Sequence, residues 1–114
     1  ALTSEDWKLS PLLKRQSDEK VFQKRYNSMF KETGLKEYLD QQGIEKLVLC
    51  GMQTEYCVDT SVKVAFEHGY KLVVPEGTVT TFDGDDIPAE TINDFYENIW
   101  DERFADVLDY KTIF

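Results

Sequence analysis

The spacing of apolar positions predicts short strands that alternate with helices. Consecutive apolar residues, typical of strands buried on both faces, occur at 47–50 and 72–74 and predict strands at 46–50 and 71–74; weaker strands are predicted at 21–24 and 107–110. Apolar residues three and four positions apart predict helices over 35–42, 57–68 and 88–100. Strands separated by helices and short loops indicate an α/β fold with a parallel sheet.

Glycine, proline and threonine residues punctuate this pattern. Gly43 and Gly69 are suited to ending the first two helices, and Pro75 to ending the strand before it. Thr33 and Thr54 are expected to cap the helices that follow them. In the last helix, Ile92, Phe95 and Ile99 are expected to share one apolar face, while residues 1–17 form a polar lead anchored by a few apolar side chains such as Trp7.

Length, composition and charge limit the possible functions. The chain has 114 residues, 41% of them hydrophobic, which is enough for the core of one domain. Its net charge of −9 argues against nucleic acids and anionic membrane surfaces as partners, since either favours clustered Lys and Arg. Because the sequence shows neither a membrane-length apolar run nor a secretory signal, a cytoplasmic protein is expected.

Two cysteines lie seven positions apart and are expected to differ in environment. Cys57 falls in the first turn of a predicted helix, where unpaired backbone N–H groups and the helix dipole favour a thiolate. Cys50 ends a predicted buried strand and is expected to be a small hydrophobic core residue. Their spacing suggests neither a disulfide framework nor a zinc site, and no cofactor is expected.

Several chemically active residues follow the predicted strands. Parallel sheets bind ligands at the carboxyl ends of their strands. Lys24 follows one strand, and the turn at 51–54, Cys57 and the loop at 76–81 follow others, so these residues could converge on one cleft. His68 is the single histidine; it lies eleven positions after Cys57 on the same predicted helix, which is about 16 Å along the axis and excludes a Cys–His pair.

The segment GMQTEYCV, followed by Ala65, Phe66, Gly69 and Tyr70, resembles the signature of the isochorismatase-like cysteine hydrolases, which include nicotinamidases and N-carbamoylsarcosine amidohydrolases. VFQKRYNSMFKETGLKEYLDQQGIEKLVL upstream and KLVVPEGTVTTFD downstream are similar to neighbouring parts of that family, and the likeness covers residues 7–110. It implies a three-layer α/β/α fold with a parallel sheet of order 3-2-1-4-5-6, to which this chain contributes the third to sixth strands.

The same resemblance implies roles for four residues. Cys57 corresponds to the nucleophile, and Lys24 to the lysine that stabilises its thiolate. A cis peptide bond is implied between Met52 and Gln53, and the backbone amides of Gln53 and Cys57 would form an oxyanion hole. The implied reaction is cleavage of an amide-type C–N bond in a small molecule through a Cys57 acyl-enzyme.

One element of the family pattern is not found. The family's catalytic aspartate ends an N-terminal apolar strand, and its metal ligands lie in the same portion; the sequence before Trp7 has no such strand. Asp59, Asp83 and Asp109 do not fit the aspartate's position. The chain is therefore expected to be a single domain, 1–114, incomplete at its N-terminus and lacking metal ligands, which assembles as a homo-oligomer or with a complementing N-terminal segment.

Two alternatives to an amidohydrolase stay open. The chain could be a catalytically incomplete fragment that acts by association, or it could be a thiol redox protein. Isochorismatase activity itself is disfavoured, because hydrolysis of a vinyl ether does not use a nucleophilic cysteine. Trp7, Phe30, Tyr56 and Trp100 could line a pocket for a planar substrate, although aromatic residues in a small domain more often belong to the core.

Overall fold

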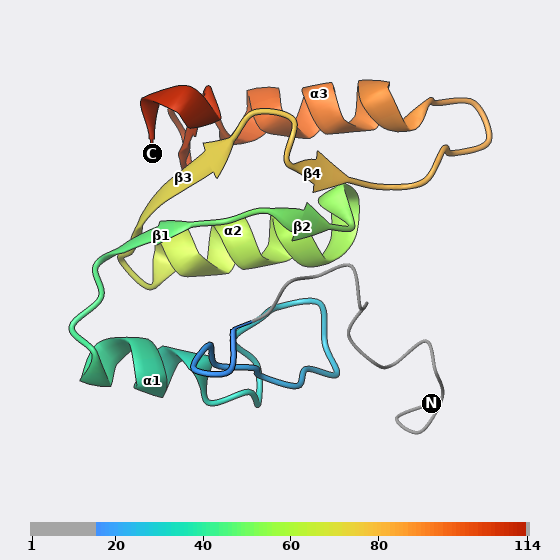
Figure 1. Cartoon of the computed structure of the whole chain (residues 1–114). Helices are drawn as coiled ribbons and strands as arrows, with labels where there is room; N and C mark the ends of the chain where they lie inside the picture. Colours follow the sequence, from blue (N-terminus) through green and yellow to red (C-terminus); the bar gives the residue numbers. More distant parts are fainter. Residues whose placement is uncertain (1–15, 114) are drawn as a thin grey trace.

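The computed structural model describes residues 16–113 and has an α/β architecture with parallel sheets, as the sequence predicts (Figure 1). The main sheet has the order β1-β3-β5, and a second sheet pairs β2 with β4. All pairings are parallel. The strand bounds are β1 Lys46–Val48, β2 Gly51–Met52, β3 Lys71–Pro75, β4 Val79–Thr80 and β5 Asp106–Leu108.

Within residues 16–113, the fold is completed by three α-helices, one π-helical turn and one 3-10 turn. The α-helices are α1 Leu35–Gln41, α2 Asp59–Glu67 and α3 Ala89–Trp100. A π-helical turn, η2 (Thr54–Val58), leads directly into α2, and a 3-10 turn, η3 (Tyr110–Thr112), follows β5. Gly43 and Gly69 have φ angles of 67° and 93°, and this left-handed conformation after α1 and α2 confirms the predicted helix ends. Within residues 16–113, every helix is too short or too polar to span a lipid bilayer.

Strand β3 forms the centre of the core. Leu72, Val73 and Val74 are nearly inaccessible to solvent, because β3 lies between β1 and β5 and helix α2 packs against it. Trp100, at the end of α3, is fully buried in the same apolar cluster. The continuous apolar run at 72–74 therefore marks a strand covered on both faces, as predicted.

The predicted strand at 21–24 is wrong. This segment has no ladder partner and is irregular in the structure. A strand exists only when its N–H and C=O groups pair with a neighbour, and the described part of the chain provides none for this segment. Phe22 packs its ring against Tyr38 of α1 at a centroid distance of 5.5 Å.

The run at 46–50 is also less buried than predicted. Exposure alternates along it: Leu47 and Leu49 are partly buried, whereas Val48 is 41% exposed and Cys50 is exposed. Successive side chains of a strand point to opposite faces of the sheet, and within residues 16–113 the face of β1 that carries Val48 is not fully covered. The expectation of a buried Cys50 is therefore wrong.

Three local predictions about the helices need correction. The N-cap of α1 is Gly34, although Leu35 N–H does donate to the Thr33 hydroxyl at 3.2 Å. The N-cap of η2 is Gln53, and Thr54 is already inside the turn. In α3, Phe95 is 61% exposed, and the buried contacts come from Tyr96, Ile99 and Trp100 instead. The predicted polar lead, with Trp7, falls almost entirely outside the described residues.

A polar cluster joins α1 to the start of β3. Tyr70 donates its hydroxyl hydrogen to Asp40 at 2.9 Å, and Lys36 forms an ion pair with the same carboxylate at 2.7 Å. The Lys36 and Tyr70 hydrogen bonds lower the pKa of Asp40 below its usual range. Burial and the hydrogen bond to Asp40 raise the pKa of Tyr70.

This cluster makes part of the stability pH-dependent. Because the pKa of Asp40 is lower in the folded state, its stabilising effect is present above its unfolded pKa, near 3.8, and is lost as the pH falls through the folded pKa. Tyr70→Phe removes one of the two donors, so it should destabilise the protein more at pH 7 than at pH 3. Urea unfolding at both pH values measures this, with the exposed Tyr110 changed to Phe as control. An equal effect of Tyr70→Phe at both pH values would contradict the expectation.

Candidate active site

Cys57 lies in the π-helical turn that opens α2, and neighbouring elements hold this turn in place. Thr54, the first residue of the turn, is fully buried. Its hydroxyl lies 3.1 Å from the carbonyl oxygen of Thr80 in β4 and 2.5 Å from Asn93 Oδ1 in α3. Thr54 therefore fixes the cysteine-bearing turn to β4 and α3 rather than acting as a helix cap.

A second contact fixes the other side of the same turn. Trp100 donates its indole N–H to Asp59 Oδ1 at 2.8 Å, and Lys63 forms an ion pair with Asp59 at 3.1 Å. A buried indole N–H that finds a carboxylate acceptor is well satisfied. The backbone around Cys57 is thus held from both ends by α3.

Lys24 contacts Cys57 directly. Its Nζ lies 3.1 Å from Cys57 Sγ and 3.0 Å from the carbonyl oxygen of Tyr26. The two residues are 33 positions apart in the sequence, and both are partly buried. An ammonium at this distance favours negative charge on the sulfur.

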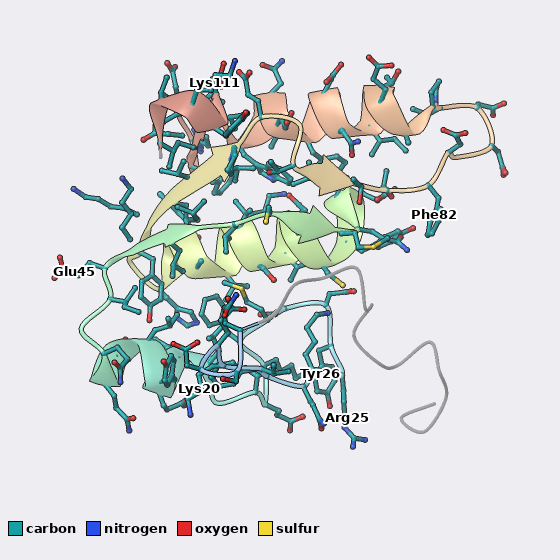
Figure 2. The ribbon with its side chains drawn as sticks, viewed as in Figure 1. Lys20, Arg25, Tyr26, Glu45, Phe82 and Lys111 are labelled. Atoms are coloured by element: carbon teal, nitrogen blue, oxygen red, sulfur yellow. The ribbon has the colours of Figure 1, made fainter. Side chains whose placement is uncertain are left out.

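The loop that carries Lys24 is attached to α2. Met29 N–H donates to the Ser61 hydroxyl at 3.0 Å, and Ser61 lies four residues, one helical turn, beyond Cys57. In Figure 2, Tyr26 and Arg25 mark this loop, which passes beneath the start of the helix. Asn27, on the same loop, places its Oδ1 3.7 Å from Cys57 Sγ. The loop therefore presents both a cation and an amide oxygen to the sulfur.

A small cavity of about 130 Å³ surrounds the sulfur. Most of its lining surface is apolar, and Lys24, Ser61 and the two cysteines supply the polar atoms and thiols. The lining residues are Lys24, Met29, Leu49, Cys50, Met52, Cys57, Val58 and Ser61. Since Leu49–Met52 follow β1 in the chain, the cavity lies at the carboxyl end of a parallel strand, where α/β folds bind ligands.

The backbone before Cys57 has an unusual conformation. The peptide bond between Met52 and Gln53 is cis. The carbonyl oxygen of Gln53 accepts N–H bonds from Tyr56 and Val58, each at 3.1 Å. These bonds close the turn around Cys57. That the amides of Gln53 and Cys57 form an oxyanion hole stays a prediction.

The carboxylates nearest in sequence to Cys57 are engaged elsewhere. Glu55 accepts a hydrogen bond from Thr81, and Asp59 accepts from Trp100 and Lys63. Asp83 accepts the N–H of Ala89 at the start of α3, and Asp109 accepts the N–H of Lys111 in η3. Among residues 16–113, no carboxylate lines the cavity.

His68 and the candidate aromatic residues of the described chain lie away from the cavity around Cys57. His68 caps the end of α2 and packs its ring edge-to-face against Phe30 at 5.1 Å. Phe30 also stacks on Tyr70, Trp100 is in the core, and Tyr56 is 55% exposed. None of the described aromatic residues lines the cavity around Cys57.

A larger groove of about 880 Å³ lies between α3 and the segment 76–81. Five carboxylate side chains line it, and its lining contains neither a cysteine nor a lysine. Size therefore does not identify the candidate site, since the contacting pair Cys57 and Lys24 lines the smaller cavity. Within the described part of the chain, no three His, Cys, Asp or Glu side chains are grouped to hold a metal ion.

Sequence reasoning missed three residues near Cys57, of which Ser61 and Cys50 line the cavity and Asn27 contacts the sulfur. Ser61 could have been found, because a residue four positions beyond Cys57 lies on the same helix face. Cys50 was assigned to the interior because its run of apolar neighbours resembles that of a central strand. Asn27 carries no local signal, since its approach to Cys57 depends on how the loop packs against α2.

Comparison with known proteins identifies a family that matches most of the chain. The family model described as "Isochorismatase domain" matches residues 1–111. The uncharacterised isochorismatase family protein YddQ of Bacillus subtilis is 37% identical over 79 residues, which are 66% of this chain and 44% of that protein. Maleamate amidohydrolase of Pseudomonas putida is 37% identical over 59 residues, which are 52% of this chain and 28% of that enzyme.

Solved structures show the same fold. A crystal structure described as an isochorismatase family protein superimposes with a TM-score of 0.90 at 32% identity, covering 94% of this chain and 64% of the other. The chain thus spans less than half of the two curated relatives and about two thirds of this structure.

Proposed function

Because the chain belongs to the isochorismatase family, we propose that it carries the nucleophilic half of a cysteine hydrolase site that cleaves amide-type C–N bonds of a small molecule. The observation that carries this proposal is the 3.1 Å contact between Lys24 Nζ and Cys57 Sγ inside a cavity at the end of a parallel strand. The similarity to maleamate amidohydrolase supports an amide substrate.

The proposed reaction has two steps. The Cys57 thiolate attacks the amide carbonyl carbon, and the C–N bond breaks as ammonia or an amine leaves with a proton. This produces a thioester on Cys57. Water then attacks the thioester carbonyl, which releases the carboxylic acid and regenerates the thiol.

The residues around Cys57 have distinct roles in this proposed reaction. Lys24 stabilises the thiolate and the developing negative charge, and the amides of Gln53 and Cys57 are proposed as donors to the oxyanion. Thr54 and Asp59 are positioning residues, since they anchor the turn that carries Cys57. Pre-organised donors are effective because they need no rearrangement as charge develops.

The small, mostly apolar cavity favours a small-molecule substrate over a macromolecule. No carboxylate among residues 16–113 reaches this cavity, so a proton-transfer group for full turnover has to come from elsewhere. We propose that a second copy of the chain or a complementing N-terminal segment provides it.

Covalent trapping tests the nucleophile. The protein is incubated with p-nitrophenyl acetate and then with small primary amides, denatured, and analysed by intact mass spectrometry. The mass should show one acyl group on the chain. Peptide mapping should place it on Cys57, and Cys57→Ala should remove it. Cys50→Ala leaves Cys57 as the single thiol and thus identifies which sulfur carries the group. An acyl group on Cys50 or on a lysine, with Cys57 unmodified, would overturn the proposal.

A further inference from the structure

Two thiols share the cavity, not one. Cys50 is exposed and Cys57 is partly exposed, and both line the same space of about 130 Å³. Only six residues separate them. Gly51, with a φ angle of 127°, lets the chain change direction directly after Cys50, and the π-helical turn then returns it to the cavity.

The two thiols differ in their electrostatic environment. Cys57 Sγ contacts the ammonium of Lys24 at 3.1 Å and the amide oxygen of Asn27 at 3.7 Å. No such contact is found for Cys50 among residues 16–113, although solvent reaches it. Thiolate character and access determine which cysteine an oxidant attacks, so Cys57 is the sulfur that is oxidised first and Cys50 is placed to react with the product.

We propose that Cys57 and Cys50 form a reversible intramolecular disulfide when the protein meets a peroxide. The main observation behind this proposal is that Cys50, which is accessible to solvent, lines the same cavity as Cys57, which is paired with Lys24. The two cysteines are seven positions apart in the chain.

The chemistry balances with hydrogen peroxide as the oxidant. The Cys57 thiolate attacks one peroxide oxygen, the O–O bond breaks, and hydroxide leaves and takes up a proton to become water, giving a sulfenic acid on Cys57. The Cys50 sulfur then attacks the Cys57 sulfur; the S–O bond breaks and a second water leaves with the Cys50 proton. Two cysteine sulfurs are each oxidised by one electron, and one peroxide is reduced to two water molecules.

The disulfide has a consequence for the proposed hydrolase activity. A sulfur bonded to Cys50 cannot attack a carbonyl carbon, so oxidation stops acyl transfer and also protects Cys57 from the irreversible sulfinic and sulfonic states. A thiol reductant restores the nucleophile. This consequence rests on the proposed function, whereas formation of the disulfide does not.

Peroxide titration tests the proposal. The full chain, Cys50→Ala and Cys57→Ala are treated with hydrogen peroxide, denatured in iodoacetamide without reductant, and analysed by intact mass and peptide mapping. The full chain should lose the mass of two hydrogens and both alkylatable thiols, and dithiothreitol should restore them. Cys50→Ala should instead gain oxygen on Cys57 and progress to the sulfinic acid. Mapping separates these products from oxidation of Met52, which also lines the cavity.

Two results would overturn the proposal. One is accumulation of sulfinic acid on Cys57 at the same rate in the full chain as in Cys50→Ala. The other is a disulfide found only between chains, seen as a dimer in a non-reducing gel. The test is independent of the hydrolase proposal: disulfide formation without acylation by p-nitrophenyl acetate would refute only the nucleophile assignment, and acylation without a disulfide would refute only the redox pair.

Discussion

Lys24→Met should slow alkylation of Cys57 by iodoacetamide by about tenfold or more, because a hydrogen bond to a charged group contributes about 1.5–3 kcal/mol. The physical cause is the loss of the ammonium that lies 3.1 Å from Cys57 Sγ. Methionine keeps the length and apolar character of the lysine stem, so it retains the packing of Lys24 against the cavity. The rate is measured by quenching at intervals and mapping the alkylated peptides.

Lys31→Met is the matched control. Lys31 lies on the same loop, 4.0 Å from the centroid of the Tyr26 ring, and is not among the residues that line the cavity. It removes the same net charge without touching the sulfur, so Cys57 should react at nearly the native rate. If both variants slow Cys57 equally, the effect comes from the general field of the chain and the specific Lys24 contact is unimportant.

In the native chain, Cys57 should react faster than Cys50. The sequence offered two reasons for this order: the position of Cys57 at a helix start near Lys24, and shielding of Cys50 by the sheet. The second reason is wrong, because the structure shows that Cys50 is exposed. The order of reactivity therefore depends on the cation at Cys57 and not on access. Faster alkylation of Cys50 would show that exposure outweighs this charge.

The elements that the sequence predicted well have strong local signals. Strand β3 was visible because Leu72, Val73 and Val74 form an uninterrupted apolar run that only a covered strand needs. Helix α3 was visible from its apolar period after Pro88, although the period misassigned the exposed Phe95. In both cases local propensity and burial pattern point to the same structure.

The elements that the sequence predicted poorly depend on partners. Residues 21–24 have strand-like composition, but a strand also needs a neighbour, and within the described residues there is none. Thr54 looked like a helix cap because threonine is common there; its hydroxyl instead bonds to Thr80 and Asn93, which are distant in sequence. Contacts between residues so distant in the sequence cannot be predicted from the local sequence pattern.

The candidate site also contains one residue with a local sequence signal and one without. Position at a helix start suggested Cys57 from the residues alone, whereas Lys24 had no stronger local reading than a solvent-exposed lysine. The family resemblance, and not the spacing of the two residues in the sequence, predicted that Lys24 and Cys57 belong to one site. The physical reason is that their contact depends on the Met29–Ser61 bond, which attaches the loop of Lys24 to α2.

Hydrolytic turnover by the chain alone should be very low. Loss of a positioned proton-transfer group typically lowers the rate by about 10²- to 10⁴-fold, and no carboxylate among residues 16–113 lines the cavity. Asp83 and Asp109 are occupied at the starts of α3 and η3, which removes the two aspartates that the sequence left unassigned. Acylation of Cys57 by an activated ester should still occur, because p-nitrophenolate leaves without needing a proton.

The measurement is ammonia release from a panel of small primary amides and carbamoyl compounds. The chain is assayed alone and with an added segment that has an apolar strand ending in aspartate, supplied in trans or fused to the N-terminus. The added segment should raise turnover by about 10²- to 10⁴-fold, and the same segment with asparagine in place of that aspartate should not. Since the aspartate and asparagine segments present the same backbone and apolar surface, a difference between them isolates proton transfer from simple stabilisation of the fold. Full activity of the chain alone would contradict the expectation; Glu5→Gln and Asp6→Asn would then test whether a carboxylate before residue 16 acts as the base.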